Sequence, residues 1–138
     1  SDGPRWDFTQ YEPQVVVVNV GTNNFANIDP GEARFVRLYH ELIHVVREAY
    51  PKAFIVCALG SMLSNVYPEG RNSLTQARKY MKVAVAKLKE AGDSNLDFLE
   101  FPEQKHADGL GCGFHPSLKT HKLMGERLTT FIKERMGW

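Results

Sequence analysis

The stretch that decides the fold is "VVVVNVGTNNF", which runs from Val15 to Phe25. Its valine-rich part, Val15 to Val20, lacks the apolar–polar alternation of a half-exposed strand. It therefore predicts a strand buried on both faces, as in a parallel sheet covered by helices. Gly21 then ends the strand, and the small polar residues "TNN" follow it. A plain turn needs only one glycine or asparagine, so this polar group indicates a further role for the turn.

Two more apolar runs lie further along the chain, "FIVCAL" at Phe54 to Leu59 and "NLDFLEF" at Asn95 to Phe101. Apolar residues at helical spacing follow each of the three predicted strands. The order is therefore β-α-β-α-β-α, which predicts a three-layer α/β/α fold with parallel strands and right-handed crossovers. The residues that carry the helical spacing are Phe35, Leu38, Leu42, Val45, Val46 and Ala49, then Leu74, Ala77, Met81, Ala84, Val85 and Leu88, then Leu118, Leu123, Met124, Leu128, Phe131 and Ile132.

Punctuating residues predict where the helices begin and end. Asp29 and Glu32 have the spacing of a capping box, with Pro30 suited to the first helical position. Pro51 ends this first helix and Gly92 ends the second. The last helix begins near "PS", residues 116–117.

The composition is that of an ordinary globular protein of one domain at most. The 138 residues are 43% hydrophobic and 24% charged, and the formal net charge is +1. No basic block indicates nucleic acid or an anionic membrane surface. No apolar run approaches the roughly 18 residues needed to span a bilayer. The first residues, "SDGPRWDF", do not have the pattern of a signal peptide.

Functional groups of open parallel sheets collect in the loops beyond the carboxyl ends of the strands. Here those loops are "GTNNF", "GSMLSNVYPEG" and "ADGLGCGFHPS". Ester hydrolysis requires a nucleophile, a base that activates it and donors for the oxyanion. His115, in the glycine-rich third loop, is a candidate base. Asn23 is a candidate oxyanion donor, and Gly21 allows a substrate to approach the backbone.

These segments resemble a known family. "VVVVNVGTNNF" resembles the third conserved block of SGNH (GDSL-type) hydrolases, and "DGLGCGFHPSLKTH" resembles the fifth, which carries the catalytic histidine. With "WDFTQYEPQ" and "YPKAFIVCALGSML", the order and spacing are similar to those of carbohydrate esterase family two, whose members deacetylate plant cell-wall polysaccharides. The resemblance covers nearly the whole chain. It implies that Asn23 serves in the oxyanion hole with Gly21 shaping its loop, and that His115 is the general base.

The sequence departs from the family pattern in three places. Asn24 stands where the third block usually has aspartate, and Cys112 stands where many members have an aspartate three residues before the histidine. Some members of the esterase family hold the imidazole with a backbone carbonyl instead, and Asp108 is the nearest acidic alternative. The Gly-Asp-Ser motif of the nucleophile is missing, because "SDG" at Ser1 to Gly3 has the wrong order. We therefore expect residues 1–138 to be the C-terminal part of one SGNH domain whose N-terminal part carries the serine.

Structural explanations compete with these roles. Asn23 and Asn24 could form only a turn, and His115 could be a helix-start residue bonded to its own loop. His40 and His44 have a spacing that can bind metal, but without an HExxH motif we expect surface histidines. A zinc site is a further alternative, formed by His106, Asp108, His115 and His121.

Two further sets of residues lie near the predicted site. Cys57 and Cys112 approach the same edge of the sheet, so a disulfide and two free thiols are both open. Side chains in the loops are candidates for contacting sugar: Phe25, Met62, Tyr67 and Phe114.

The resemblance implies a secreted esterase that removes O-acetyl groups from xylan or glucomannan by a serine acyl-enzyme route, without metal or cofactor. Its partners would be the acetylated polysaccharide and the N-terminal half of its own domain. A non-catalytic module that binds carbohydrate or protein is the rival from another class, and a zinc-dependent hydrolase is the third reading. In the family's sheet order, 2-1-3-4-5, the three strands of this chain are the last three, so Val15 to Val20 would form an open edge.

Overall fold

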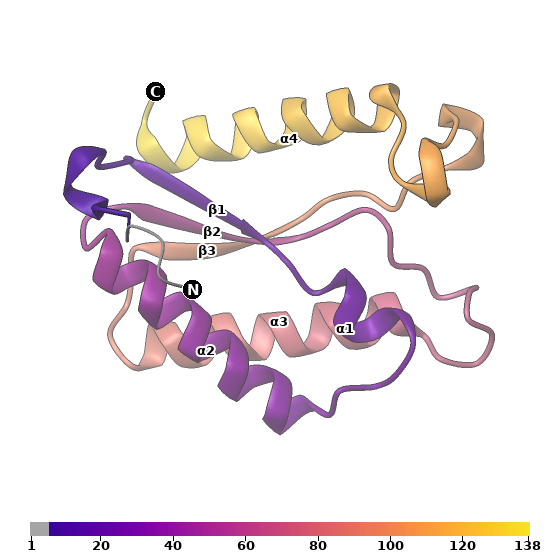
Figure 1. The fold of residues 1–138 in the computed structure, drawn as a ribbon, viewed down its shortest axis with the longest axis horizontal. Coiled ribbons are helices and arrows are strands. Elements are labelled where there is room, and N and C mark those ends of the chain that lie inside the picture. Colours follow the sequence, from indigo (N-terminus) through magenta and orange to yellow (C-terminus); the bar gives the residue numbers. More distant parts are fainter. Residues whose placement is uncertain (1–5) are drawn as a thin grey trace.

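The computed structural model describes residues 6–138 as a parallel three-stranded sheet between two layers of helices (Figure 1). The strands are β1 (Val15–Asn19), β2 (Phe54–Leu59) and β3 (Leu96–Glu100), in the spatial order β1-β2-β3. Both pairs are parallel, with Val17 opposite Val56 and Val56 opposite Asp97. The predicted α/β/α class and strand order are confirmed. Ser1 to Gly3, where a nucleophile motif was sought, lie outside the described residues.

Helices α1 (Thr22–Ala26), α2 (Glu32–Ala49) and α3 (Ser73–Glu90) lie on one face of the sheet, and α4 (Leu118–Met136) lies on the other (Figure 1). Short 3-10 turns occur at η1 (Phe8–Gln10), η2 (His106–Asp108) and η3 (Cys112–Phe114). Within residues 6–138, none of the helices combines the length and apolar content needed to cross a membrane.

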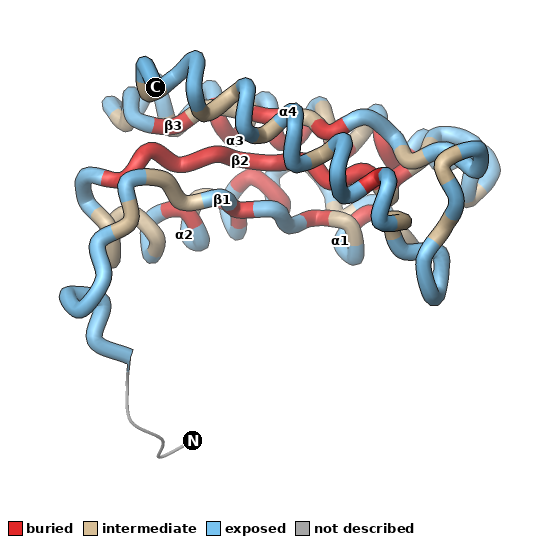
Figure 2. The backbone as a smooth tube through the Cα atoms, turned by 90° about the horizontal axis from the view of Figure 1, so that it is seen from above, coloured by how far each residue is buried: buried red, intermediate tan, exposed pale blue. Residues whose placement is uncertain are grey.

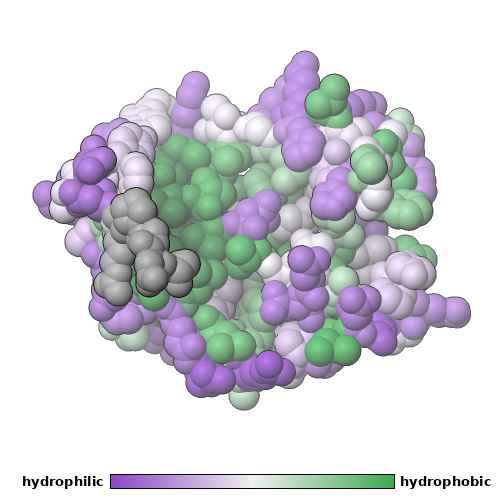
Figure 3. Space-filling view, in the orientation of Figure 1, coloured by the Kyte–Doolittle hydropathy of each residue, from purple (hydrophilic) through white to green (hydrophobic). Residues whose placement is uncertain are grey.

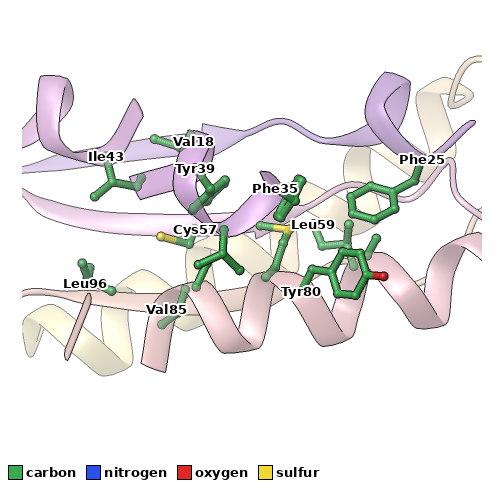
Figure 4. Packing of buried hydrophobic residues seen from close by; sticks show 14 of the residues in the cluster. Val18, Phe25, Phe35, Tyr39, Ile43, Cys57, Leu59, Tyr80, Val85 and Leu96 are labelled. Atoms are coloured by element: carbon green, nitrogen blue, oxygen red, sulfur yellow. The ribbon is translucent and has the colours of Figure 1, made fainter. Parts of the chain in front are cut away.

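The central strand β2 belongs to two hydrophobic clusters at once. Ile55, Cys57 and Leu59 face α2 and α3 in the larger cluster, part of which is drawn in Figure 4. Their neighbours Phe54, Val56 and Ala58 face α4 in the smaller one. All six residues of β2 are buried, as the tube in Figure 2 shows. Because successive side chains of a strand point to opposite faces, a strand covered on both sides must be apolar throughout.

Two local predictions are wrong. The capping box at Asp29 and Glu32 does not form, because α2 begins at Glu32 with Gly31 (φ 77°) as its N-cap. The Asp29 carboxylate instead accepts from the Gly31 backbone N–H at 2.9 Å and from the Tyr80 hydroxyl at 3.1 Å. The segment "GTNNF" is not only a turn, since residues 22–26 form the short helix α1.

The amino ends of the strands are held together by one side chain. Arg47, at the end of α2, makes a two-pronged ion pair with Asp93 at 3.0 and 3.1 Å. The same guanidinium donates to the carbonyls of Ala53 at 2.6 Å and Asn95 at 3.0 Å, which directly precede β2 and β3. Its planar fork suits several acceptors at once. Arg47 therefore ties α2 to the starts of two neighbouring strands.

The two edges of the sheet differ in chemistry. Charged side chains close the β3 edge: Asp97 pairs with Lys89 of α3 and Arg135 of α4, and Glu100 pairs with Arg78 of α3 at 2.6 Å. Arg127 of α4 also donates to the Glu100 carbonyl at 2.7 Å. Edges protected in this way resist the addition of another strand.

In the described part of the chain, no ion pair covers the β1 edge in this way. Val17 is 38% exposed and Val20 is 41% exposed, although both were expected to be buried if the strand had partners on both sides. Figure 3 looks onto this edge and shows an apolar hollow over β1, beneath α4. On the other face, α2 adds Leu38, Leu42 and Val45, an exposed apolar stripe at helical spacing. The expected open edge is therefore present in residues 6–138.

Candidate active site

The three predicted loops lie at one end of the molecule, beyond the carboxyl ends of the strands (Figure 1). Residues 20–31 follow β1, residues 60–72 follow β2 and residues 101–117 follow β3. Parallel register places the exits of adjacent strands side by side, with Asn19 opposite Ala58 and Leu59 opposite Glu100. At Gly60 a Cβ atom would come within 3.1 Å of Asn19 Oδ1, so the β1 and β2 exits are in close contact.

Gly21 begins the first loop in a conformation that favours glycine, with φ 116°. It is the N-cap of α1, and its carbonyl accepts from the Asn24 N–H at 2.9 Å and the Phe25 N–H at 3.3 Å. This sharp change of direction carries Asn23 to the exposed surface of α1 while the helix stays attached to β1. The structure thus presents the Asn23 amide beyond the carboxyl end of β1.

Phe25 is a core residue, which corrects its expected role in sugar contact. Its side chain is 1% exposed and packs on Phe35 and Tyr80, with ring centroids 4.9 and 5.6 Å away. The Ser73 hydroxyl donates to the Phe25 carbonyl at 3.0 Å. Burial of this ring fixes α1 on α2 and α3. Phe25 therefore positions α1 and does not face solvent (Figure 4).

The loop after β3 first runs beside the exit of β2. The Phe101 N–H donates to the Leu59 carbonyl and the Gln104 N–H donates to the Ser61 carbonyl, both at 2.9 Å. After η2 and η3 the chain reaches His115, which is exposed and extended, with φ −67° and ψ 162°. These contacts lead the loop from β3 back toward β2.

Hydrogen bonds close the His115 loop on itself. The Gly111 N–H donates to the His115 carbonyl at 2.7 Å, beside an antiparallel bridge between Leu110 and Pro116. The Ser117 hydroxyl donates to the Asp108 carbonyl at 2.7 Å and accepts from the backbone of Thr120, so it caps α4 as well. The start of the last helix near residue 117 was predicted, and the structure confirms it.

The Asp108 carboxylate pairs with a lysine and does not orient His115, the role that we considered for it. Its Oδ1 lies 2.6 Å from Lys119 Nζ, and no hydrogen bond joins it to His115 within residues 6–138. Over the same residues, no group of three or more histidine, cysteine, aspartate or glutamate side chains is placed to hold a metal ion. His106, Asp108, His115 and His121 are thus not brought together. Among residues 6–138 His40 makes no ion pair with a carboxylate, and its Nε2 lies 2.9 Å from the Ala84 carbonyl.

Both cysteines are free thiols, so the disulfide that we held open is not formed. Cys57 belongs to the larger cluster, which also contains the buried Tyr39 (Figure 4). Burial raises the pKa of the Cys57 thiol to about 11, and burial together with Cys57 raises the pKa of Tyr39. Cys112 is exposed in η3. Because helices cover both faces of β2, the Cys57 side chain lies in the core.

Exposed apolar side chains surround the loops. Tyr67 is 80% exposed and Phe114 is 73% exposed, whereas Met62 is half-buried. Val66, which the sequence did not single out, is 80% exposed, and Leu118, expected on the apolar face of the last helix, is 89% exposed. An apolar residue in a loop or first helical turn carries no pattern that separates a surface position from a core one. The sequence also did not single out Gln104, because its hydrogen-bond partners, Phe114 and Ser61, are distant in the chain.

Residues 2–123 match the GDSL-like lipase/acylhydrolase family. The chain belongs to that family. It is 43% identical over 136 residues to "Cellulase/esterase CelE" of Acetivibrio thermocellus, and 23% identical over 135 residues to "Acetylxylan esterase / glucomannan deacetylase" of Cellvibrio japonicus. These matches cover 99% and 98% of the chain but 16% and 34% of the two proteins.

Solved structures agree with the fold. A family two carbohydrate esterase from Clostridium thermocellum, in complex with cellohexaose, matches 99% of the chain with a TM-score of 0.91 and 43% identity. A family two carbohydrate esterase from Cellvibrio japonicus matches with a TM-score of 0.83 at 21% identity. The chain spans 40% and 37% of those structures. The resemblance to SGNH hydrolases and family two carbohydrate esterases is confirmed.

The positions of the two thiols predict very different reactivities. Brief alkylation with iodoacetamide at neutral pH, followed by peptide mass spectrometry, should modify Cys112 and leave Cys57 unmodified until the protein is unfolded. The physical reason is that the thiolate is the nucleophile, and burial with a raised pKa removes it at Cys57. Cys112→Ser should abolish the rapid labelling. Protection of both cysteines after unfolding without a reductant would show that they are paired.

Proposed function

We propose that this chain is part of a carbohydrate acetyl esterase in which Asn23 and His115 belong to the catalytic machinery. The observation that carries the proposal is the 43% identity to a cellulase/esterase over nearly the whole chain, with both residues in family-motif positions beyond the carboxyl ends of the strands. The substrate would be an acetylated polysaccharide such as xylan or glucomannan, as the name of the second relative suggests. The site of action would be extracellular.

The proposed reaction passes through an acetyl-enzyme. His115 takes the proton of a serine hydroxyl as that oxygen attacks the acetyl carbonyl. Asn23 donates to the oxyanion of the tetrahedral intermediate, with Gly21 setting the path of its loop. The intermediate expels the sugar oxygen, which receives the proton from His115. Water, activated by the same imidazole, then releases acetate and restores the serine.

The open β1 edge supports a place for the missing serine. A preceding part of the domain would add a strand beside β1 and apolar side chains over Val17 and the stripe at Leu38, Leu42 and Val45. A groove of about 390 Å³ between α1 and α2 also opens on this side, next to Asn23. In the family's sheet order the nucleophile strand lies next to β1. The serine would therefore lie next to Asn23.

The exposed aromatic side chains support carbohydrate as the ligand. Tyr67 and Phe114 are exposed in loops at the same end of the sheet as Asn23 and His115. Exposed aromatic rings can pack on the apolar faces of sugars, and the Tyr67 hydroxyl can stay in water. A non-catalytic carbohydrate-binding module is the second candidate, because sugar binding through these rings does not require a nucleophile. Loss of acetate release on changing His115 distinguishes the esterase from the module.

His115 is expected to be essential as a base. In the full-length protein, His115→Ala should lower acetate release from acetylated xylo-oligosaccharides to near background, because no other group takes the serine proton. His121→Ala, on the exposed surface of α4, is the matched control and should keep most of the activity. Equal losses in His115→Ala, His121→Ala and His106→Ala would favour the metal reading instead.

Asn23 is expected to act in the transition state. Asn23→Ala in the full-length protein should lower kcat by roughly 10²–10³ with little change in KM, the effect of removing one oxyanion donor. Asn27→Ala, just past the end of α1, is the control for a general effect on this segment. Steady-state kinetics on the same oligosaccharides make the measurement. A raised KM with an unchanged kcat would place Asn23 in ground-state binding and refute the role.

The β1 edge is expected to be an internal contact of the full-length domain. Val17→Lys should lower its melting temperature by several degrees, since a charge would be buried without a partner. Val66→Lys, at a side chain that is 80% exposed, should leave the melting temperature unchanged. Calorimetry on the two variants makes the comparison. Equal melting temperatures would mean that β1 stays uncovered.

A further inference from the structure

The backbone directly before His115 adopts an unusual conformation. Gly113 has φ 59° and Phe114 has φ 63°, so two successive residues are left-handed. For a residue with a side chain this region costs on the order of 1 kcal/mol or more. The Phe114 ring is 73% exposed, so its packing does not repay that cost. Strained residues of this kind persist only where neighbouring contacts hold them.

Gln104 supplies such a contact. Its Nε2 donates to the Phe114 carbonyl at 2.8 Å, and its backbone N–H donates to the Ser61 carbonyl at 2.9 Å. Ser61 is buried just past β2. One residue therefore links the peptide group before His115 to the exit of the central strand. The other closures of this loop, from Gly111 to His115 and from Ser117 to Asp108, join the loop only to itself.

The other end of the same amide is unsatisfied. Gln104 Oε1 is buried and has no hydrogen-bond partner among residues 6–138. An unmade bond at a buried acceptor costs about 1–3 kcal/mol, so for stability alone an apolar side chain of this length would serve equally well. The hydrogen bond from Nε2 to the Phe114 carbonyl gives a reason for a glutamine at this position despite that cost. The residue thus has the character of a functional position.

We propose that Gln104 is a positioning residue for His115. By holding the Phe114 carbonyl, it fixes the plane of the Phe114–His115 peptide bond and hence the direction in which the imidazole leaves the backbone. The orientation of the imidazole is then fixed relative to the end of β2, which lies next to β1, the strand that precedes Asn23. The inference rests on the proposed role of His115 as the base. Displacing a base by about 1 Å is enough to cost up to 10²-fold in rate.

Gln104→Met in the full-length enzyme separates positioning from stability. Methionine fills the same space, removes the Nε2 donor and also removes the unsatisfied Oε1. The melting temperature should therefore stay the same or rise, while kcat on acetylated xylo-oligosaccharides falls roughly 10- to 100-fold and KM stays within about twofold. Gln104→Glu, which keeps the shape but sets a carboxylate against the Phe114 carbonyl, should lower kcat as well. Gln14→Ala, an exposed glutamine at the opposite end of the sheet, is the control.

Hydrogen exchange tests the same inference without using activity. In Gln104→Met the amides of Gly111 and His115 should exchange faster, while β2 keeps its protection. If the wild-type enzyme releases no acetate, the proposed function fails, and the exchange rates alone decide whether Gln104 holds the His115 turn. Unchanged exchange together with an unchanged kcat would overturn the inference. A raised KM with an unchanged kcat would also overturn it, by assigning Gln104 to sugar binding.

Discussion

The pairing of β2 with a parallel neighbour on each side is the constraint on which the rest of the structure depends. All six of its side chains are buried, and they alternate between the two hydrophobic clusters. Any substitution on β2 therefore changes the packing of one of the two clusters. The same pairing aligns the exits of three strands, which is why residues far apart in the sequence meet at one edge. Core packing and the location of the site are two results of one arrangement.

The sequence was most informative where a pattern extends over many residues. The continuous apolar runs predicted all three strands, and helical spacing predicted α2, α3 and α4, because burial of a whole face leaves a long periodic signal. The positions of Asn23 and His115 beyond the strand ends followed from the strand order. Their catalytic roles came from the family resemblance and stay predictions.

Single contacts between distant residues were not predictable. The carboxylate of Asp29 is engaged by Tyr80 and Gly31 rather than by the first turn of α2, and Lys119 takes the carboxylate of Asp108. Phe25 is drawn into the core by rings from α2 and α3. In each case a tertiary contact outweighed a local preference that the sequence displays. The unpaired Oε1 of Gln104 has no signal in the sequence.

The turn that presents His115 is closed by its own hydrogen bonds and joined through Gln104 to Ser61, at the start of the loop after β2. Residues 62–72, which carry Tyr67, make no part of that closure. Substitutions there would change the surface that we propose to contact sugar. The segment that carries Tyr67 can therefore change in sequence without removing any hydrogen bond that holds the His115 turn.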